Sequence, residues 1–174
     1  MSDIRVATID DAEAIALVHV NSWKETYRGL MPDRVLDELS IEQRTLVWSN
    51  RLNDPHDPYH RVLVAEAKGR TVAFASYGKE LTNDPDHRGE LFAIYVLKEF
   101  QGQGIGTSLV RKVADGLQGL NITSMLVWAL ADNPYRKFYE RLGGVYLREK
   151  VIEIGGESLK EEAYGWSDVR SMIG

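Results

Sequence analysis

The spacing of apolar residues changes along the chain, and each change marks a predicted element. A short apolar stretch at residues 4–7 is typical of a strand, and the segment that follows, as far as Tyr27, is typical of a helix. Thr8 and Asp11 are spaced as in a capping box, which satisfies free N–H groups at a helix start. A second helical stretch is expected from Pro32.

A longer helix is predicted over residues 41–52. Ser40 and Gln43 form another capping box ahead of it, and a Pro-rich stretch ends it. The apolar periodicity predicts a buried face made of Ile41, Leu46, Val47 and Leu52.

From residue 61 the apolar residues alternate, which is the period of strands. Residues 61–67 and 71–78 predict a hairpin, and residues 90–97 predict a third strand after a polar loop. A helix is expected next. Its apolar stripe consists of Ile105, Leu109, Val113 and Leu117.

The last third of the chain predicts a buried strand at 123–130, a helix at 133–142, and a hairpin of strands 145–154 and 159–166. The resulting order of strands and helices is that of a mixed sheet with helices packed on it, an α/β (α+β) fold. With 174 residues, of which 44% are hydrophobic, we expect one domain over residues 1–174.

Composition excludes several kinds of protein. No apolar run is long enough to span a membrane and the first residues do not resemble a signal peptide, so we expect a cytoplasmic protein with no membrane partner. The chain has no cysteine, which excludes a thiolate nucleophile and disulfides. The four histidines show no ligand spacing, so no metal is expected. A net charge of −5 argues against nucleic acid as a partner.

The stretch QGQGIG, residues 101–106, lies between a predicted strand and a predicted helix. Such a loop aims backbone N–H groups and the helix dipole at one point, which favours an anion, although a plain tight turn is the alternative. A dinucleotide fingerprint would need glycine at Thr107 or Leu109, and no lysine follows as in a P-loop. The pattern that remains is Q-x-x-G-x-G.

In this pattern the segment VLKEFQGQGIGTSLV resembles the acetyl-CoA signature of the GNAT superfamily of acyl-CoA N-acyltransferases. IRVATIDDAEAI, SWKETYRGLMP and WALADNPYRKFYERLGG also resemble family segments, in the family's order. The resemblance implies a mostly antiparallel sheet of about seven strands flanked by about four helices. It also implies acetyl-CoA as cofactor and a homodimer.

The resemblance assigns cofactor-binding roles to two neighbouring segments and one asparagine. The amides that would hold the pyrophosphate belong to Gln101, Gly102, Gln103, Gly104, Ile105, Gly106 and Thr107. The strand residues that would bind the pantetheine arm are Ile94, Tyr95 and Val96. Asn133 matches an asparagine that contacts the coenzyme, but with Pro134 after it this residue also suits a helix N-cap, the reading we favour.

Two residues are candidates for catalysis. Tyr139 matches the family tyrosine that protonates the coenzyme sulfur, although its helical spacing also suits a core residue. Glu90 opens a strand where the family often has a carboxylate that accepts the amine's proton through water; an ordinary strand-end carboxylate is the alternative. Alternation predicts that Glu90, Phe92, Ile94 and Val96 share one face.

The acceptor is expected to be a small-molecule primary amine or polyamine. His19, Trp23 and Tyr27 recur every four residues, which is typical of core; by resemblance, Trp23 and Tyr27 contact the substrate. Residues 1–60 hold 6 Lys+Arg against 11 Asp+Glu, a difference of −5 that equals the net charge of the chain. The acidic residues that we expect to attract a cationic acceptor are Asp33, Asp37, Glu38 and Glu42.

The sequence thus predicts an acetyl-CoA-dependent N-acetyltransferase that works by direct attack in a ternary complex. The alternative is a non-catalytic acyl-CoA-binding regulatory module that keeps the loop without the chemistry. A nucleotide-dependent oxidoreductase lacks its fingerprint glycine.

Overall fold

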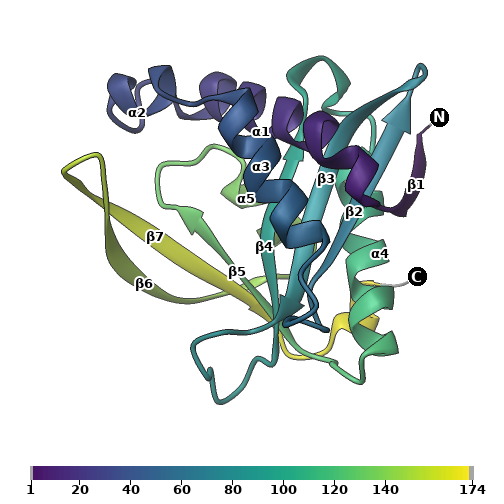
Figure 1. The fold of residues 1–174 in the computed structure, drawn as a ribbon. Coiled ribbons are helices and arrows are strands. Elements are labelled where there is room, and N and C mark those ends of the chain that lie inside the picture. The colour runs from purple at the N-terminus through teal and green to yellow at the C-terminus, as the bar shows by residue number, and fades with distance from the viewer. Residues whose placement is uncertain (1, 173–174) are drawn as a thin grey trace.

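The computed structural model describes residues 2–172 (Figure 1). The strands are β1 (Asp3–Val6), β2 (Arg61–Ala67), β3 (Arg70–Lys79), β4 (Gly89–Val96), β5 (Met125–Leu130), β6 (Val145–Ile154) and β7 (Glu157–Trp166). The α-helices are α1 (Ala12–Tyr27), α2 (Asp33–Asp37), α3 (Ile41–Leu52), α4 (Ile105–Gly119) and α5 (Arg136–Arg141). Short 3-10 helices cover Ile9–Asp11, Lys98–Phe100 and Val169–Met172.

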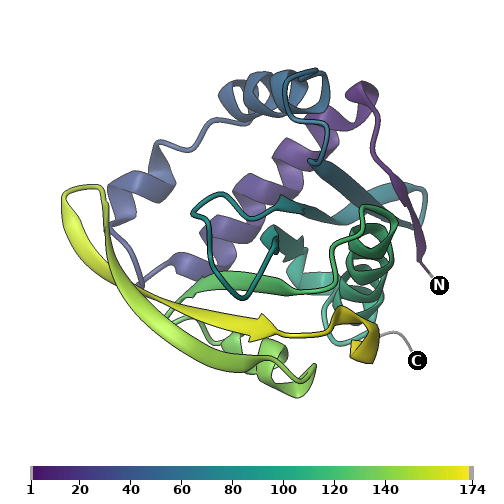
Figure 2. The same cartoon turned by 90° about the horizontal axis from the view of Figure 1, so that it is seen from below.

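The strands form one seven-stranded sheet in the order β1-β2-β3-β4-β5-β7-β6. Neighbouring strands are antiparallel except β4 and β5, which are parallel. Helices α1 and α3 lie on one side of the sheet and α4 and α5 on the other, as Figure 2 shows. The mixed, mostly antiparallel fold expected from the sequence is therefore confirmed. Within residues 2–172 no helix is long and apolar enough to cross a membrane.

Local sequence signals account for several of these elements. The Thr8 N–H donates to the Asp11 carboxylate over 2.7 Å, and the Gln43 N–H donates to the Ser40 hydroxyl over 3.2 Å. In α4 the predicted apolar stripe is buried against the sheet, at Ile105, Leu109, Val113 and Leu117. Capping and periodicity thus fix where these helices begin and which way they face.

The buried face of α3 differs from the prediction. Trp48 is its buried residue, whereas Leu46 is 67% exposed and Val47 39%. The Trp48 indole N–H donates to Nδ1 of His19 over 3.2 Å, and its ring packs against Phe74. Burying the large Trp48 ring, with a partner for its N–H, stabilises the fold more than burying Leu46 and Val47 would. Trp48 therefore decides which face of α3 is turned to the core.

A β-bulge in β4 overturns the predicted alternation on that strand. Ser76 and Tyr77 are consecutive on β3, but their partners on β4 are Ala93 and Leu91, so Phe92 is an extra residue. Because cross-strand partners share a face, the bulge reverses the alternation beyond it.

As a result, Glu90 does not share a face with Ile94 and Val96. Glu90 pairs with Gly78 and Tyr95 with Phe74, which places both on the face covered by α1 and α3. Ile94 and Val96 pair with Ala75 and Ala73 and face α4, where a Cβ at Gly106 would lie 4.0 Å from the Val96 side chain.

Strands β4 and β5 separate soon after they begin. They pair only through residues 89–91 of β4 and 125–127 of β5. Beyond Leu91, β4 keeps its hydrogen bonds to β3 but has no strand neighbour on its other edge within residues 2–172, and Figure 1 shows β5 turning away. This opening in the middle of the sheet positions the site.

Candidate active site

A cavity of about 450 Å³ fills the opening between β4 and β5. Residues 92–96 and 127–129 of the two strands form its sides. The start of α4 and the residues of α5 line it on one side of the sheet, and Ser22, Thr26 and Tyr27 of α1 line it on the other. The cavity therefore passes from one face of the sheet to the other, and two molecules can meet inside it from opposite sides.

The glycine-rich loop lies at the α4 end of this cavity. Gly102 and Gly104 have φ angles of 75° and 84°, which L side chains rarely adopt, and a Cβ at either would meet nothing within 4 Å. The first α-helical hydrogen bond joins the Ser108 N–H to the Gly104 carbonyl over 3.0 Å. The N–H groups of Gly102 to Thr107, which precede it, have no backbone acceptor among residues 2–172 and are available to a ligand.

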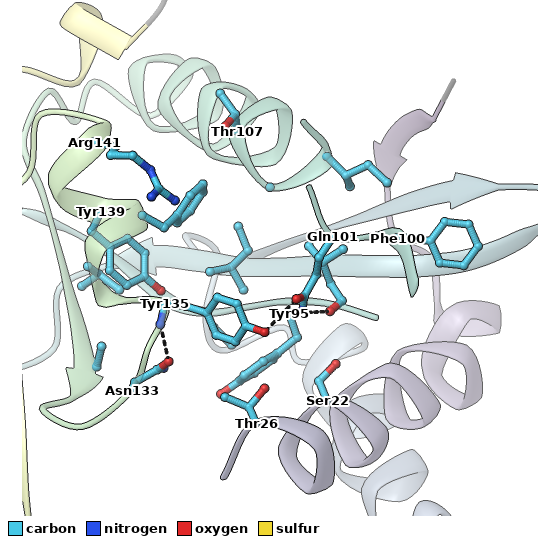
Figure 3. Close-up of a pocket in the computed structure, with 18 of the residues that line it drawn as sticks. Ser22, Thr26, Tyr95, Phe100, Gln101, Thr107, Asn133, Tyr135, Tyr139 and Arg141 are labelled. Atoms are coloured by element: carbon cyan, nitrogen blue, oxygen red, sulfur yellow. Dashed lines mark hydrogen bonds between the residues drawn. The ribbon is translucent and has the colours of Figure 1, made fainter. Parts of the chain in front are cut away.

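The Gln101 side chain links the glycine-rich loop to the end of β4 and to the segment before α5, as Figure 3 shows. Its side-chain amide donates to the Val96 carbonyl over 3.0 Å and accepts from the Tyr135 hydroxyl over 2.7 Å. This contact crosses the cavity from the loop to the segment before α5. Gln103 instead donates to the Glu99 carbonyl and does not line the cavity.

Tyr139 enters the cavity from α5. Its ring is 8% exposed and packs against Phe138, Tyr164 and Trp166. Figure 3 shows it reaching into the space that Tyr95 enters from β4. Burial, with Tyr95 close by, raises the pKa of Tyr139, so its phenol keeps its proton at neutral pH.

Asn133 lines the cavity but does not cap α5. Its side-chain oxygen accepts the Tyr135 N–H over 2.9 Å and its carbonyl accepts the Arg136 N–H, so it closes the turn before a helix that starts at Arg136. The predicted N-cap role is therefore wrong, because Pro134 belongs to this turn and not to the first turn of the helix.

Glu90 lies at the paired end of β4, next to the cavity but outside its lining. Partial burial raises the pKa of its carboxyl to about 7, and Glu80 and Glu161 add to the rise while Lys150 opposes it. A carboxyl with such a pKa can take up and release a proton near neutral pH.

The expected acceptor residues lie in an aromatic cluster on α1. Tyr27 is buried and lines the cavity, whereas Trp23 packs edge-on against it at 5.2 Å and does not reach the lining. The His19 ring stacks on Tyr95 with centroids 5.5 Å apart. Burial lowers the pKa of His19 to about 4, so this imidazole is neutral at pH 7.

Sequence reasoning missed several residues of the cavity. The additional lining residues include Ser22, Thr26, Trp128, Tyr135, Phe138 and Arg141. Tyr135 and Phe138 belong to the helical spacing that contains Tyr139, which offers a signal. Ser22 and Thr26 lie four residues apart on α1, but nothing local indicates that their common face borders a gap in the sheet.

The fold is that of an acetyltransferase. The chain matches the family described as Acetyltransferase (GNAT) family over residues 21–144. It is 35% identical over 173 residues to the uncharacterized N-acetyltransferase YuaI of Bacillus subtilis (strain 168), an alignment that covers 99% of this chain and 96% of that one.

Solved structures share the fold at low sequence identity. An N-acetyltransferase from Staphylococcus aureus Mu50 superposes with a TM-score of 0.73 at 18% identity, covering 97% of this chain and 99% of that one. A PaiA N-acetyltransferase from Thermoplasma acidophilum, solved in complex with coenzyme A, gives 0.66 at 20% identity, covering 93% and 98%. The chain belongs to the GNAT acetyltransferase family and is an acetyl-CoA-dependent N-acetyltransferase.

Proposed function

We propose that this enzyme transfers the acetyl group of acetyl-CoA to a small primary amine or polyamine by direct attack in a ternary complex. The observation that carries the proposal is the cavity that crosses the sheet, with backbone donors at one end and side chains of α1 at the other. Acetyl-CoA supplies an activated acyl group as a thioester. We also place the reaction in the cytoplasm, with residues 1–174 acting as one catalytic domain.

The α4 end of the cavity fits the cofactor's anionic and amide groups. Gly102 and Gly104 leave the loop surface clear, and the N–H groups from Gly102 to Thr107 suit a diphosphate, whereas the Gln101 N–H already donates to the Lys98 carbonyl over 3.2 Å. The open edge of β4 over Ile94–Val96 suits an amide chain, which can pair with it as a strand would. The related fold of the Thermoplasma acidophilum protein, which binds coenzyme A, supports this placement.

Two side chains move protons in the proposed reaction. As the amine nitrogen bonds to the acetyl carbon, Glu90 takes one proton from that nitrogen through water. As the carbon–sulfur bond breaks, the Tyr139 hydroxyl gives its proton to the sulfur. Backbone N–H groups on the free edge of β4 stabilise the negative charge on the acetyl oxygen.

The absence of cysteine supports direct transfer, because no thiolate in the chain can carry the acetyl group. Thiol release from acetyl-CoA should therefore depend on an added amine. The test is a coupled thiol assay across a panel of small amines, polyamines and amino acids, with coenzyme A binding measured in parallel. Binding without thiol release for every amine would instead favour a regulatory module.

A further inference from the structure

One face of the sheet next to the cavity carries two carboxylates. Glu161 on β7 pairs in register with Leu130 on β5 and with Lys150 on β6, so all three share a face. Leu126 pairs with Glu90, which places Glu90 on this same face, the one covered by α1. Glu161 was not singled out by the sequence, because it lies in a charged stretch of a hairpin strand.

Neither carboxylate has a cation within ion-pair distance among residues 2–172. Lys150 is the basic group that acts on both, yet its ammonium lies over the Trp128 ring, 4.0 Å from the centroid. Burial raises the pKa of the Glu161 carboxyl, as it does for Glu90. A half-buried carboxylate without a cationic partner lowers the stability of the folded protein. A role in binding would explain why the protein has two of them.

The cavity next to them offers groups that suit a cation. Leu130, the register partner of Glu161, packs in one cluster with Tyr27 and Tyr95, so Glu161 lies on the α1 side of the cavity although it is not part of the lining. Tyr27 and Tyr95 present aromatic rings there, and rings of this kind attract ammonium groups. The Lys150 ammonium over Trp128 is an example of this contact on the same face.

A buried polar group points independently to a ligand in this region. Ser22 lines the cavity with only 2% of its surface exposed, and its hydroxyl has no hydrogen-bond partner within the described chain. A buried hydroxyl usually has a partner, and an ammonium group in the cavity can donate to its oxygen.

The acidic residues expected from the charge pattern are less suited to this task. Arg28 forms ion pairs with Asp33 at 3.3 Å and with Asp37 at 3.0 Å, all on the exposed surface. Part of the negative charge around α2 is thus balanced within the protein. Glu38 and Glu42 are exposed to solvent, which screens their charge, whereas Glu161 is half-buried.

We propose that Glu161 selects the acceptor by binding a second ammonium group, so that the preferred substrates are diamines or polyamines. This inference rests on the proposed function. The reacting nitrogen must be neutral to attack, and Glu90 serves that nitrogen; Glu161 is left for a cation that stays charged throughout the reaction. Tyr95 lies on the same face as Glu90, and the rings of Tyr27 and Tyr95 both line the cavity.

The test compares three primary amines with the same five-carbon chain and different far ends: cadaverine (ammonium), pentylamine (methyl) and aminovalerate (carboxylate). Their kcat/KM values are measured with acetyl-CoA, and their Kd values for the enzyme–coenzyme A complex by calorimetry. Glu161→Gln removes the charge at nearly constant shape. Glu149→Gln is the matched control, because Glu149 is an exposed carboxylate on the opposite face that pairs with Lys160.

The expected order for the wild type is cadaverine, pentylamine, aminovalerate. Glu161→Gln should weaken cadaverine about tenfold or more in kcat/KM and Kd, the effect of losing one charged contact, while pentylamine changes less than about twofold. Glu149→Gln should change neither. Lys150→Met, which removes the competing cation, should tighten cadaverine binding.

Other outcomes overturn the inference. Equal losses for cadaverine and pentylamine in Glu161→Gln would mean a structural role, and wild-type rates that are alike for the two amines would remove the selectivity itself; in both cases the proposed function stands. If coenzyme A binds but none of a broad panel of amines is acetylated, the proposed function fails and this inference fails with it.

Discussion

The two ends of the cavity are built on different principles. The α4 end consists mainly of backbone from one continuous stretch, residues 94–107, in which glycines expose N–H groups. The α1 end is assembled from side chains that are far apart in the sequence, such as Ser22, Tyr27 and Tyr95. A site made of backbone suits a ligand that is always the same, and it produces a recognisable local sequence pattern. A site made of distant side chains can differ with the acceptor and produces no such pattern.

The largest effect is expected where the two ends meet, at Tyr139. Tyr139→Phe should lower kcat by about tenfold to ten-thousandfold, because the leaving sulfur loses its proton donor, while the affinity for acetyl-CoA stays unchanged. Steady-state kinetics and a binding titration measure the two quantities separately.

The matched control for this prediction is Tyr164→Phe. Tyr164 packs near Tyr139, but its hydroxyl donates to Glu162 over 2.7 Å and does not line the cavity. Its loss should leave kcat unchanged. Equal kcat values for Tyr139→Phe and the wild type would return Tyr139 to a packing role.

The backbone end should respond to a side chain on its surface. Coenzyme A should raise the Tm of the wild type by mass action, and Gly104→Val should abolish that rise because the side chain occupies the phosphate position. The substitution also strains the backbone, since φ is 84° at this residue, so the shift on adding coenzyme A is compared and not the Tm alone.

Two further variants separate these causes. Gly119→Val, at the other end of α4, has open space and should keep the coenzyme-induced shift. Gly104→Asn adds a side chain that tolerates this backbone conformation and should still lose the shift. A normal shift in both Gly104 variants would place the cofactor elsewhere.

Glu90 should give a smaller, pH-dependent effect. With a pKa of about 7 in the folded protein, its base form increases as pH rises through 7, so kcat/KM should rise there. Glu90→Gln should remove this rise from the pH profile of kcat/KM, so that only the titration of the amine substrate remains. The groups that shape the titration are Glu80, Glu161 and Lys150. An unchanged pH profile in the variant would exclude Glu90 as the base.

The same shift predicts a stability change. The folded pKa of Glu90, about 7, is above the ordinary value of 4.5, so folding favours the protonated form and ionisation destabilises the fold. That cost is absent below pH 4.5, grows between 4.5 and 7, and is complete above 7. Glu90→Gln should therefore raise the Tm above about pH 7 more than at about pH 4, a difference that thermal melts at both pH values measure.

Most of the fold, and the α4 end of the cavity, could be predicted from local sequence patterns. Capping residues such as Ser40, the period-two pattern that predicts strands β2 and β3, and the stripe on α4 all depend on neighbours in the chain, and the structure agrees with them. The buried face of α3 could not be predicted, because Trp48 finds its partner, His19, on another helix. The bulge at Phe92 also depends on pairing between strands, and it moved Glu90 to the α1 face.

The side-chain end of the site shows the same limit. Glu161 and Ser22 matter only because β4 and β5 separate, and the sequence gives no sign of where a pair of neighbouring strands stops pairing. At Asn133 the sequence did contain a capping pattern, but the structure does not follow it, because α5 begins at Arg136, three residues after Asn133.

We propose that acetyl-CoA and the amine are bound together when the acetyl group moves, and the cavity with lining residues on both faces of the sheet supports this proposal. The most direct test measures initial rates while both substrates are varied, with cadaverine as the amine. Double-reciprocal plots should give intersecting lines, the pattern of a ternary complex. Parallel lines, the pattern of an acetylated enzyme intermediate, would contradict the account.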